Sequence, residues 1–494
     1  MSEEWCREQL ENLQIKDLRT NTLNEIKNQL VKLPANENEI TSKFIKSPIL
    51  LDCLEDSTTT NEQTALLCDI LSICMSSLSL DTTNIKTTLE RSLSHSNTSV
   101  QQLAIAEIEK LINSSSITNV FDVNLIILLV KCIESDDSKV GTPVIEILVK
   151  ILPNFIHINS VKVNLENTLD RSDIVRCRTY EVGVKLARIS QQLLENVEYI
   201  LQKAIVELDS EDILLQLNLL EILSELPLYQ HGFVYLENRK VFEKLVKKIE
   251  LMEENPLSRI LIPGLMRFFG NVAQIHPSKI FNGYPNVINA LFDCLLANDY
   301  SILPVAFDTL ANLASSNDGK KFLDSVPGQK MKVIARELYS MLRNLPSELK
   351  IRLLNCLEAL FRIDPNLSDN QVTCITQSWY EIFSSSSDLT VIMEYAKNSF
   401  PDIKIASIGW LKAICLHKWG QEFFRNTAGF LEYLLDRKSE FDKNVLLEKY
   451  EIIRILSESD RVFDIETLNE LRKYVREGAF YVQGVTEVAI EGGN

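Results

Sequence analysis

The stretch that decides the fold runs from Arg259 to Ala314 and reads RILIPGLMRFFGNVAQIHPSKIFNGYPNVINALFDCLLANDYSILPVAFDTLANLA. Its first and last parts have apolar residues at the spacing of an α-helix, and a further helical pattern at 287–296 lies between them. Each of the two outer patterns carries an asparagine near its end, Asn271 or Asn312, followed two positions later by alanine. This recurrence indicates one unit of a repeating helical array.

The same type of helix recurs along the chain, with a polar or β-branched start and a helical period of apolar residues. Its starts are predicted near Ser99, Lys139, Ile174, Ile213, Ile260, Ile302, Leu349, Ile403 and Asn444. Their mean spacing of about 43 residues lies within the roughly 40–47 residues of armadillo and HEAT repeats. Stacked units of this kind bury their apolar faces against one another. We therefore expect an all-α, armadillo/HEAT-like helical-repeat solenoid with a curved superhelical groove.

Three glycines recur after helices of this type, and a hydrophobic pair or near-pair follows each of them after two variable residues. They are Gly232, Gly319 and Gly420. A glycine in this place suits the left-handed conformation with which many helices end. The pattern therefore predicts a helix C-cap at each glycine, with the hydrophobic pair starting the next helix.

The chain is predicted to have three parts. Residues 1–98 form an N-terminal helical cap and a first repeat, and residues 99–476 form the armadillo/HEAT-like array. An amphipathic segment at 465–476 could close the array. Beyond it, residues 477–494 break the helical period and become rich in glycine near the end, which predicts an extended C-terminal tail.

The composition excludes several classes of protein. Apolar residues make up 45% of the chain, enough for a folded core, whereas 15 glycines and 14 prolines are too few for the turns of a Rossmann-type, barrel or all-β enzyme of this length. The net charge of −17 disfavours nucleic acid and anionic membranes as partners, because both repel an acidic surface. Basic or mixed-charge protein surfaces remain as partners.

The cysteines and the N-terminus indicate a reducing compartment. The ten cysteines are spread singly, and none forms a Cys-x-x-Cys pair, so we expect reduced, buried thiols. The acidic, amphipathic N-terminal segment does not resemble a signal peptide. We expect a cytoplasmic or nuclear protein.

The chain lacks the motifs that mark common catalytic sites. It contains no Gly-x-x-x-x-Gly-Lys-Ser/Thr phosphate loop, no Gly-x-Ser-x-Gly elbow, no His-Glu-x-x-His and no Cys/His zinc spacing. Two of its five histidines, His231 and His417, are interpreted as helix-end residues near the negative end of a helix dipole. We therefore expect no catalytic residue, no cofactor and no metal site, and predict that the protein is not an enzyme.

Polar side chains on the repeated helices are the candidates for partner binding. By analogy with importin-type armadillo proteins, in which Trp and Asn four residues apart hold an extended peptide, the groove-facing residues are predicted to be Arg267, Asn271, Asp308, Asn312 and Asn355. Arginine or aspartate stands where those proteins have tryptophan, and the four tryptophans form no ladder, which disfavours recognition of a basic peptide. An alternative is that the asparagines only tie neighbouring repeats together through backbone hydrogen bonds.

Several separated blocks, from about residue 170 to the end, carry a resemblance to a known family. They include Asp173–Arg176 with Arg178, Tyr180 and Glu181; Gln230–Gly232; Ile262–Leu265 with Phe268–Asn271; Ala306, Asp308 and Thr309; Glu348–Arg352; Gly429, Phe430, Tyr433, Asp436, Arg437, Asp442, Lys443, Lys449 and Tyr450; and Glu477, Gly478, Tyr481, Val482 and Ala489–Gly492. In this order the blocks resemble the proteasome non-ATPase regulatory subunit 5 family of assembly chaperones.

The resemblance implies a non-catalytic helical-repeat chaperone of the proteasome regulatory-particle base. Members of this family bind a base ATPase subunit, chiefly through its C-terminal domain, and escort ATPases with the large non-ATPase scaffold subunit into the base. They leave before the finished proteasome forms, and they act by covering a surface that the core particle or neighbouring subunits need. The protein is then expected to be a monomer before it binds its partners.

Two other functions are weighed against this one. The first is a generic armadillo-repeat adaptor in transport or ubiquitin signalling, although a basic-peptide receptor would need the missing tryptophan ladder. The second is an enzyme, which would need a site assembled across repeats that no motif indicates.

Overall fold

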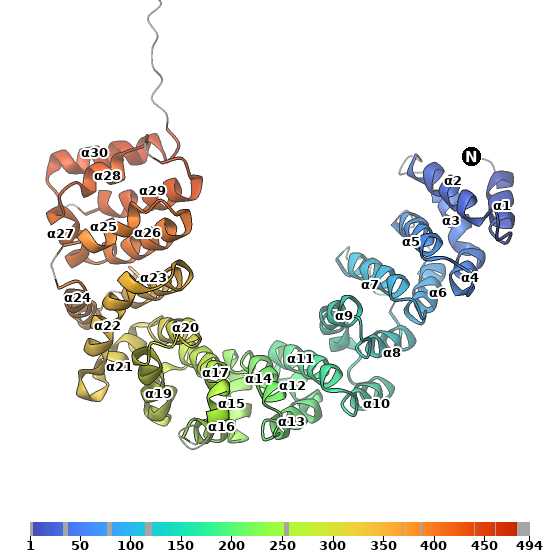
Figure 1. Cartoon of the computed structure of the whole chain (residues 1–494), viewed down its shortest axis with the longest axis horizontal. Helices are drawn as coiled ribbons and strands as arrows, with labels where there is room; N and C mark the ends of the chain where they lie inside the picture. Colours follow the sequence, from blue (N-terminus) through green and yellow to red (C-terminus); the bar gives the residue numbers. More distant parts are fainter. Residues whose placement is uncertain are drawn as a thin grey trace, which may run out of the picture. The chain divides into compact units, whose positions relative to one another are not determined.

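The computed structural model describes residues 3–32, 38–76, 82–113, 121–250, 256–367, 369–385, 388–438, 440–459 and 461–481. These residues form helices joined by short turns, with no β-strand among them (Figure 1). No helix in these ranges combines the length and the apolar character needed to cross a bilayer. The predicted tail lies outside the described residues from residue 482 onward.

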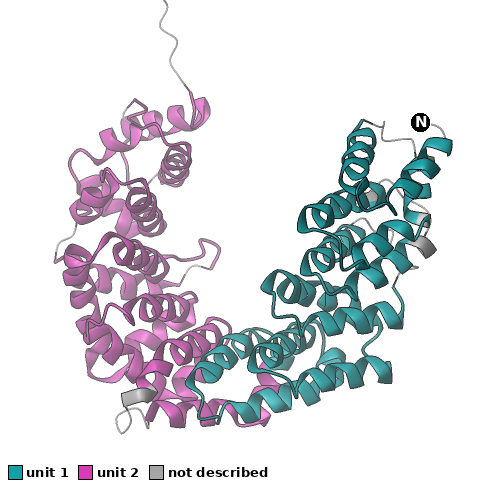
Figure 2. Ribbon diagram, turned by 45° about the vertical axis from the view of Figure 1, so that its right-hand side comes forward, with its two compact units in different colours: residues 1–232 teal, residues 233–494 magenta. Residues whose placement is uncertain are grey.

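The chain divides into two compact units, Met1–Gly232 and Phe233–Asn494 (Figure 2). The predicted parts, residues 1–98, 99–476 and 477–494, divide the chain by type of segment rather than by compactness. This division stays a prediction. Helix α15 (Gln230–Asn238) begins in the first unit and ends in the second.

Unit 1 contains a row of helices that pack one on the next, which we call its front helices. They are α2 (Arg19–Val31), α5 (Asn61–Ser76), α7 (Thr98–Asn113), α9 (Ser138–Ile151), α11 (Asp173–Ile189) and α14 (Ile213–Leu223). The other helices of unit 1 are its back helices: α1 (Glu3–Asn12), α3 (Asn38–Lys46), α4 (Ile49–Glu55), α6 (Thr82–Leu93), α8 (Val123–Cys132), α10 (Asn159–Thr168), α12 (Gln191–Asn196) and α13 (Glu198–Glu207), with 3-10 turns η1 (Leu152–Asn154) and η2 (Leu226–Leu228).

Unit 2 repeats this arrangement. Its front helices follow one another along one side of the unit (Figure 1) and are α17 (Ile262–Ile275), α20 (Leu303–Leu313), α23 (Ser347–Phe361), α26 (Pro401–Cys415) and α29 (Lys443–Ser457). Its back helices are α16 (Val241–Glu250), α18 (Pro277–Gly283), α19 (Pro285–Leu296), α21 (Asn317–Ser325), α22 (Lys330–Asn344), α24 (Asn370–Ser384), α25 (Thr390–Ala396), α27 (Lys418–Asn426), α28 (Phe430–Leu435) and α30 (Ile465–Glu477), with 3-10 turns η4 (Pro256–Leu261) and η5 (Pro327–Gln329).

The predicted helix starts are confirmed, since each lies within two residues of the start of a front helix. Capping aspartates and first-turn prolines determine where several of these helices start. Asp137, Asp212 and Asp442 each stand just before a front helix and accept backbone N–H groups of its first turn. Pro304 and Pro401 occupy the first turns of α20 and α26, where a missing N–H removes no helical hydrogen bond.

The predicted role of the recurring glycines is wrong. Gly232, Gly319 and Gly420 are the third residues of α15, α21 and α27, and none of them has a positive φ. A Cβ atom at these positions would lie 2.2, 1.8 and 2.1 Å from the carbonyl oxygens of Leu226, Leu313 and Ile414, respectively. Glycine is required there because a back helix begins against the end of the preceding helical segment, and the close approach leaves no room for a side chain.

Ion pairs one repeat apart tie successive front helices together. They are Lys27–Asp69, Glu146–Lys185, Asp308–Arg352 and Lys412–Glu448. Most of the side chains involved are partly exposed, and exposed pairs contribute about 0–1 kcal/mol each to stability. The apolar core therefore holds the units together, while the pairs help to set the register of neighbouring repeats.

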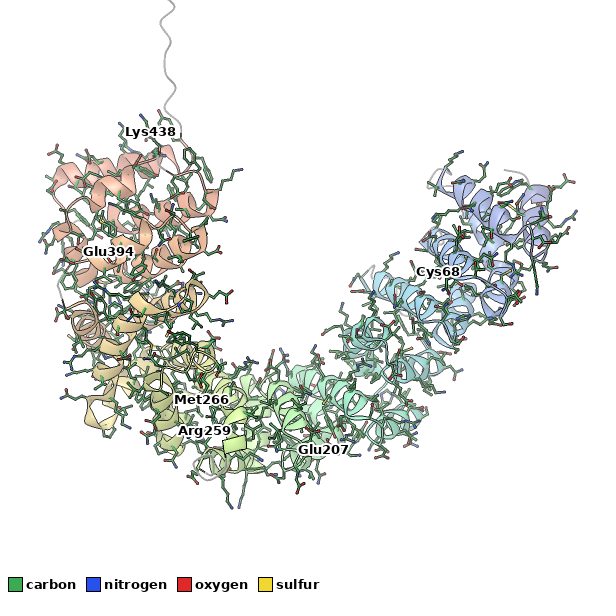
Figure 3. The ribbon with its side chains drawn as sticks, viewed as in Figure 1. Cys68, Glu207, Arg259, Met266, Glu394 and Lys438 are labelled. Carbon is green, nitrogen blue, oxygen red and sulfur yellow. The ribbon has the colours of Figure 1, made fainter. Side chains whose placement is uncertain are left out.

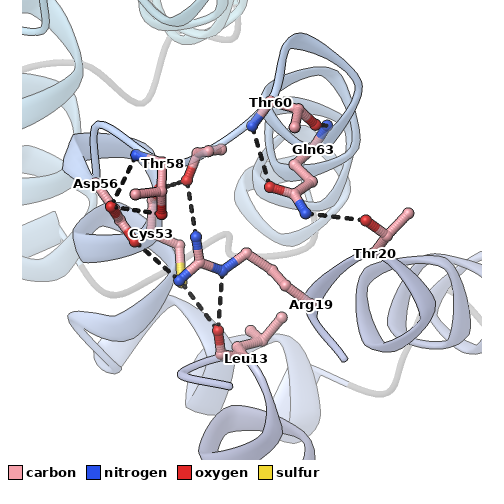
Figure 4. Close-up of polar contacts among 9 residues, drawn as sticks. Leu13, Arg19, Thr20, Cys53, Asp56, Thr58, Thr60 and Gln63 are labelled. Atoms are coloured by element: carbon pink, nitrogen blue, oxygen red, sulfur yellow. Dashed lines mark hydrogen bonds and ion pairs between the residues drawn. The ribbon is translucent and has the colours of Figure 1, made fainter. Parts of the chain in front are cut away.

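A more buried tie lies at the N-terminal end of unit 1 (Figure 4). The Arg19 side chain, 5% exposed, donates to the Leu13 carbonyl at 3.1 Å, to Thr59 Oγ1 at 3.0 Å and to Asp56 Oδ2 at 3.0 Å. Bonds from Thr58 and from Arg19 lower the pKa of Asp56 to about 2. This cluster fixes the loop after α4 against the turn before α2.

Arg178→Ala is expected to destabilise unit 1 by about 2–3 kcal/mol, because it leaves two carbonyls at the end of α8 without their donor. Arg178 reaches from α11 across Gly141 of α9, and its Nη1 donates to the Ile133 carbonyl at 2.9 Å and to the Ser135 carbonyl at 2.6 Å. Urea denaturation followed by circular dichroism measures the loss.

Arg171→Ala is the matched control for this change. Arg171 makes an ion pair with Glu134 at 3.4 Å, and the two side chains are 57% and 34% exposed. Its loss is expected to cost less than about 1 kcal/mol. Equal losses for the two variants would contradict the anchoring role of Arg178.

Candidate partner-binding surface

The five predicted binding residues lie on three successive front helices of unit 2. Arg267 and Asn271 belong to α17, Asp308 and Asn312 to α20, and Asn355 to α23. Arg267, Asp308 and Asn355 are exposed, whereas Asn271 and Asn312 are half-buried. Since α17 packs on α20 and α20 packs on α23, these residues stand on neighbouring helices, and we call the set the polar row.

Arg352 of α23 also belongs to the polar row and is absent from the predicted set. Its Nη1 donates to Asp308 Oδ2 at 2.9 Å, and the two side chains are 51% and 57% exposed. Asp308 is therefore paired with the next repeat rather than standing alone. The sequence did contain a signal for this pair, because Arg352 carries the charge opposite to that of Asp308 and lies about one repeat further along the chain.

Close packing of α17 on α20 positions the first half of the polar row. Thr309, buried beside Asp308, donates from Oγ1 to the Met266 carbonyl at 3.0 Å, and Met266 is labelled in Figure 3. A Cβ atom on Gly270 would lie 3.2 Å from Cα of Thr309, so the two backbones nearly touch. A buried threonine thus links two neighbouring repeats through a backbone hydrogen bond. From the sequence alone, the asparagines are the alternative candidates for this role.

The tryptophans agree with the absence of a peptide-binding ladder. Trp379, Trp410 and Trp419 are at most 4% exposed. Trp410 and Trp419 pack in an aromatic cluster with Phe361 and Tyr380, and Trp379 donates from Nε1 to Asp324 Oδ1 at 3.0 Å. The polar row instead presents Arg267, Arg352 and Asp308, which is a mixed-charge surface. Such a surface complements a folded partner of mixed charge better than a uniformly basic peptide.

The two singled-out histidines have structural contacts. Nε2 of His231 lies 2.7 Å from the Ala187 carbonyl, and Nε2 of His417 lies 2.7 Å from the Phe361 carbonyl. Both carbonyls belong to the last turn of the front helix of the preceding repeat, as expected for helix-end residues. Burial lowers the pKa of His417 to about 4, so this imidazole is neutral and donates from Nε2.

The described residues contain no cluster of three or more His, Cys, Asp or Glu side chains placed to hold a metal ion. All ten cysteines are free thiols, and Cys374 is the exposed one. Burial raises the pKa of the innermost thiols, Cys356 and Cys415, which opposes formation of the reactive thiolate.

Comparisons with known proteins cover nearly the whole chain. A family model described as "Proteasome non-ATPase 26S subunit" matches residues 2–494. The "26S proteasome non-ATPase regulatory subunit 5" of Drosophila melanogaster is 33% identical, over 99% of this chain and 99% of that protein. The Homo sapiens protein of the same name is 28% identical over 83% of each chain. The match thus extends over the first 170 residues, beyond the part in which the sequence blocks suggested it.

A solved structure supports the fold independently of sequence. Importin beta superposes with a TM-score of 0.52 over 95% of this chain and 68% of that chain, at 12% sequence identity. At this identity the likeness concerns the fold alone. Together with the two rows of helices, it confirms the predicted armadillo/HEAT-like solenoid.

Proposed function

The chain belongs to the proteasome non-ATPase 26S subunit family, and we propose that it is an assembly chaperone for the base of the proteasome regulatory particle. It binds the C-terminal domain of a base ATPase subunit and escorts it together with the large non-ATPase scaffold subunit. It sterically blocks premature docking on the core particle and is absent from the finished proteasome. It works as a monomer before binding, in the cytoplasm or nucleus.

The observation that carries this proposal is the polar row. Exposed side chains of α17, α20 and α23 stand on helices that pack directly on one another, so they form a surface that is rigid before a partner arrives. A pre-formed surface loses less conformational entropy on binding than a mobile one. The Asp308–Arg352 pair joins two repeats within the row, so one partner would cover several repeats at once.

The relatives, the fold and the net charge favour a binding role without catalysis. The relatives are named regulatory subunits, and the fold is a helical-repeat scaffold. The net charge of −17 favours basic or mixed-charge protein surfaces over nucleic acid. We propose that occlusion, rather than any chemical step, is how the protein acts, and that it needs no cofactor.

Arg267→Glu is expected to weaken binding to the C-terminal domain of a base ATPase by about tenfold or more, which corresponds to about 1.4 kcal/mol. Reversing an exposed charge changes the complementarity of the surface and leaves the apolar core intact. Isothermal titration with each purified ATPase C-terminal domain measures the affinity. Lys279→Glu is the control, because Lys279 is a similarly exposed cation on the back helix α18 of the same unit.

The Asp308–Arg352 pair separates recognition from structure. Asp308→Arg alone removes the pair, and Asp308→Arg combined with Arg352→Asp restores it with the opposite polarity. If a partner binds the charges of Asp308 and Arg352 directly, both variants are expected to bind it weakly. If the pair only sets the register of the repeats, the double variant recovers full affinity, and the polar row is then not a recognition surface.

A tagged pull-down with mass spectrometry tests the role in cells. Base ATPases recovered without core-particle subunits support the assembly chaperone. Recovery of complete proteasomes would indicate instead that the protein is a resident subunit. Recovery of neither would leave the armadillo adaptor as the better hypothesis.

A further inference from the structure

A second candidate surface lies in unit 1, whereas the polar row belongs to unit 2. A cavity of about 470 Å³ opens where α9, α11 and the segment after η2 meet. Val149, Ile189 and Tyr229 supply its apolar lining. Ile189 is 55% exposed and Tyr229 is 39% exposed. Large apolar side chains that line a concave site are common anchors of protein–protein interfaces.

The aromatic side of this cavity is held in place before any ligand binds. Arg188 donates to the Tyr229 hydroxyl at 3.2 Å, and its guanidinium lies 5.2 Å from the centre of the tyrosine ring. The ring of His231 lies 6.1 Å from the same ring and is itself anchored on the Ala187 carbonyl. Because Tyr229 is positioned by three contacts, little conformational entropy remains to be lost when a partner packs on it.

The charges around the cavity are arranged with the carboxylates outermost. Lys185 pairs with Glu146 and with Glu181, and Arg188 pairs with Glu225. The two cations are only 20% and 29% exposed, whereas Glu146, Glu181 and Glu225 are 63%, 37% and 42% exposed. Among the residues that line the cavity, two carboxylates balance two cations, but the carboxylates of Glu146 and Glu225 are the more exposed charges. An incoming partner therefore meets exposed carboxylates beside the exposed apolar side chains of Ile189 and Tyr229.

We propose that this cavity, the Tyr229 pocket, binds a segment of a partner protein that presents a large apolar side chain beside a lysine or arginine. The apolar side chain packs on Ile189 and Tyr229, and the cation meets the carboxylates of Glu146 and Glu225. An acidic neighbour would instead face the like charges of these two exposed carboxylates. The pocket selects by side-chain chemistry, so the proposal holds whether or not the partner is a proteasome subunit.

Fluorescence anisotropy with short labelled peptides tests the pocket in the full chain. The peptides share one neutral, soluble background and differ only at two central positions: Leu-Arg, Leu-Glu, Ser-Arg or Ser-Glu. The Leu-Arg peptide is expected to bind at least about tenfold more tightly than the other three. Equal affinities for all four peptides would overturn the proposal.

Ile189→Asp is expected to weaken binding of the Leu-Arg peptide by at least about tenfold. Val206→Asp is the matched control, because Val206 is 64% exposed in the last turn of α13 and does not line the pocket. Both changes place a carboxylate near a helix C-terminus, so their direct cost to folding is similar. Equal loss of binding in the two variants would overturn the assignment.

Glu146→Lys tests the charge selection separately. It is expected to shrink the preference for Leu-Arg over Leu-Glu, while a variant that merely perturbed the fold would weaken both peptides alike. The proteasome subunits take no part in these measurements. Failure of the Tyr229 pocket and failure of the assembly role are therefore distinguishable.

Discussion

Gly319→Ala is expected to destabilise unit 2 by about 3 kcal/mol, near the upper end of what one added methyl group costs in a packed site. Gly319 is the third residue of α21, and the added Cβ atom would lie 1.8 Å from the carbonyl oxygen of Leu313. A flexible side chain could move aside, but this oxygen belongs to the backbone of α20. Either α21 or the end of α20 must shift, and the packing between them is lost.

Urea denaturation of the full chain measures this effect, with Gly283→Ala as the control. Gly283 is the last residue of α18, and nothing lies within 4 Å of the position of its missing Cβ. Alanine there is expected to be neutral or to stabilise by up to about 1 kcal/mol, because alanine favours the helix more than glycine does. If the two variants had equal stability, close approach would not be the reason for glycine at 319. Gly420→Ala, 2.1 Å from the Ile414 carbonyl, is expected to behave like Gly319→Ala.

Acidification from about pH 7 to about pH 5 is expected to cost the protein about 2 kcal/mol of stability through His417 alone. The pKa of His417 is lowered from 6.5 to about 4. Burial is the main cause, the nearby charge of Lys320 adds to it, and the bond to the Phe361 carbonyl opposes it. Between these two pKa values the unfolded chain binds a proton that the folded chain excludes, so stability falls as the pH falls and this contribution is lost by about pH 4.

His417→Gln isolates this contribution, because glutamine can still donate to the Phe361 carbonyl but does not titrate. Burial lowers the pKa of Lys320 to about 8, so this lysine stays mostly protonated across the window and adds little to the slope. The difference in unfolding free energy between wild type and His417→Gln is expected to change by about 2 kcal/mol from about pH 7 to about pH 5. Parallel pH profiles for the two proteins would show that His417 titrates normally.

The front helices could be predicted from the sequence because their signals are local. Apolar periodicity, capping aspartates such as Asp212 and prolines such as Pro401 act within one or two turns of a helix. The row of Arg267, Asp308 and Asn355 followed from the same periodicity, because repeated helices place equivalent positions side by side. Its role in partner binding stays a prediction.

The sequence by itself thus determined the helical-repeat class and the starts of the front helices. Only the tertiary structure decided that Gly319 serves close packing rather than a left-handed cap, that Asp308 pairs with Arg352, and that Arg188 and Tyr229 share a pocket. The physical reason is that these contacts join residues of different helical segments. Each contact depends on how one helix lies against another after stacking. Hydrophobic periodicity specifies which face of a helix is buried, but it does not specify how closely two backbones approach or which charges meet.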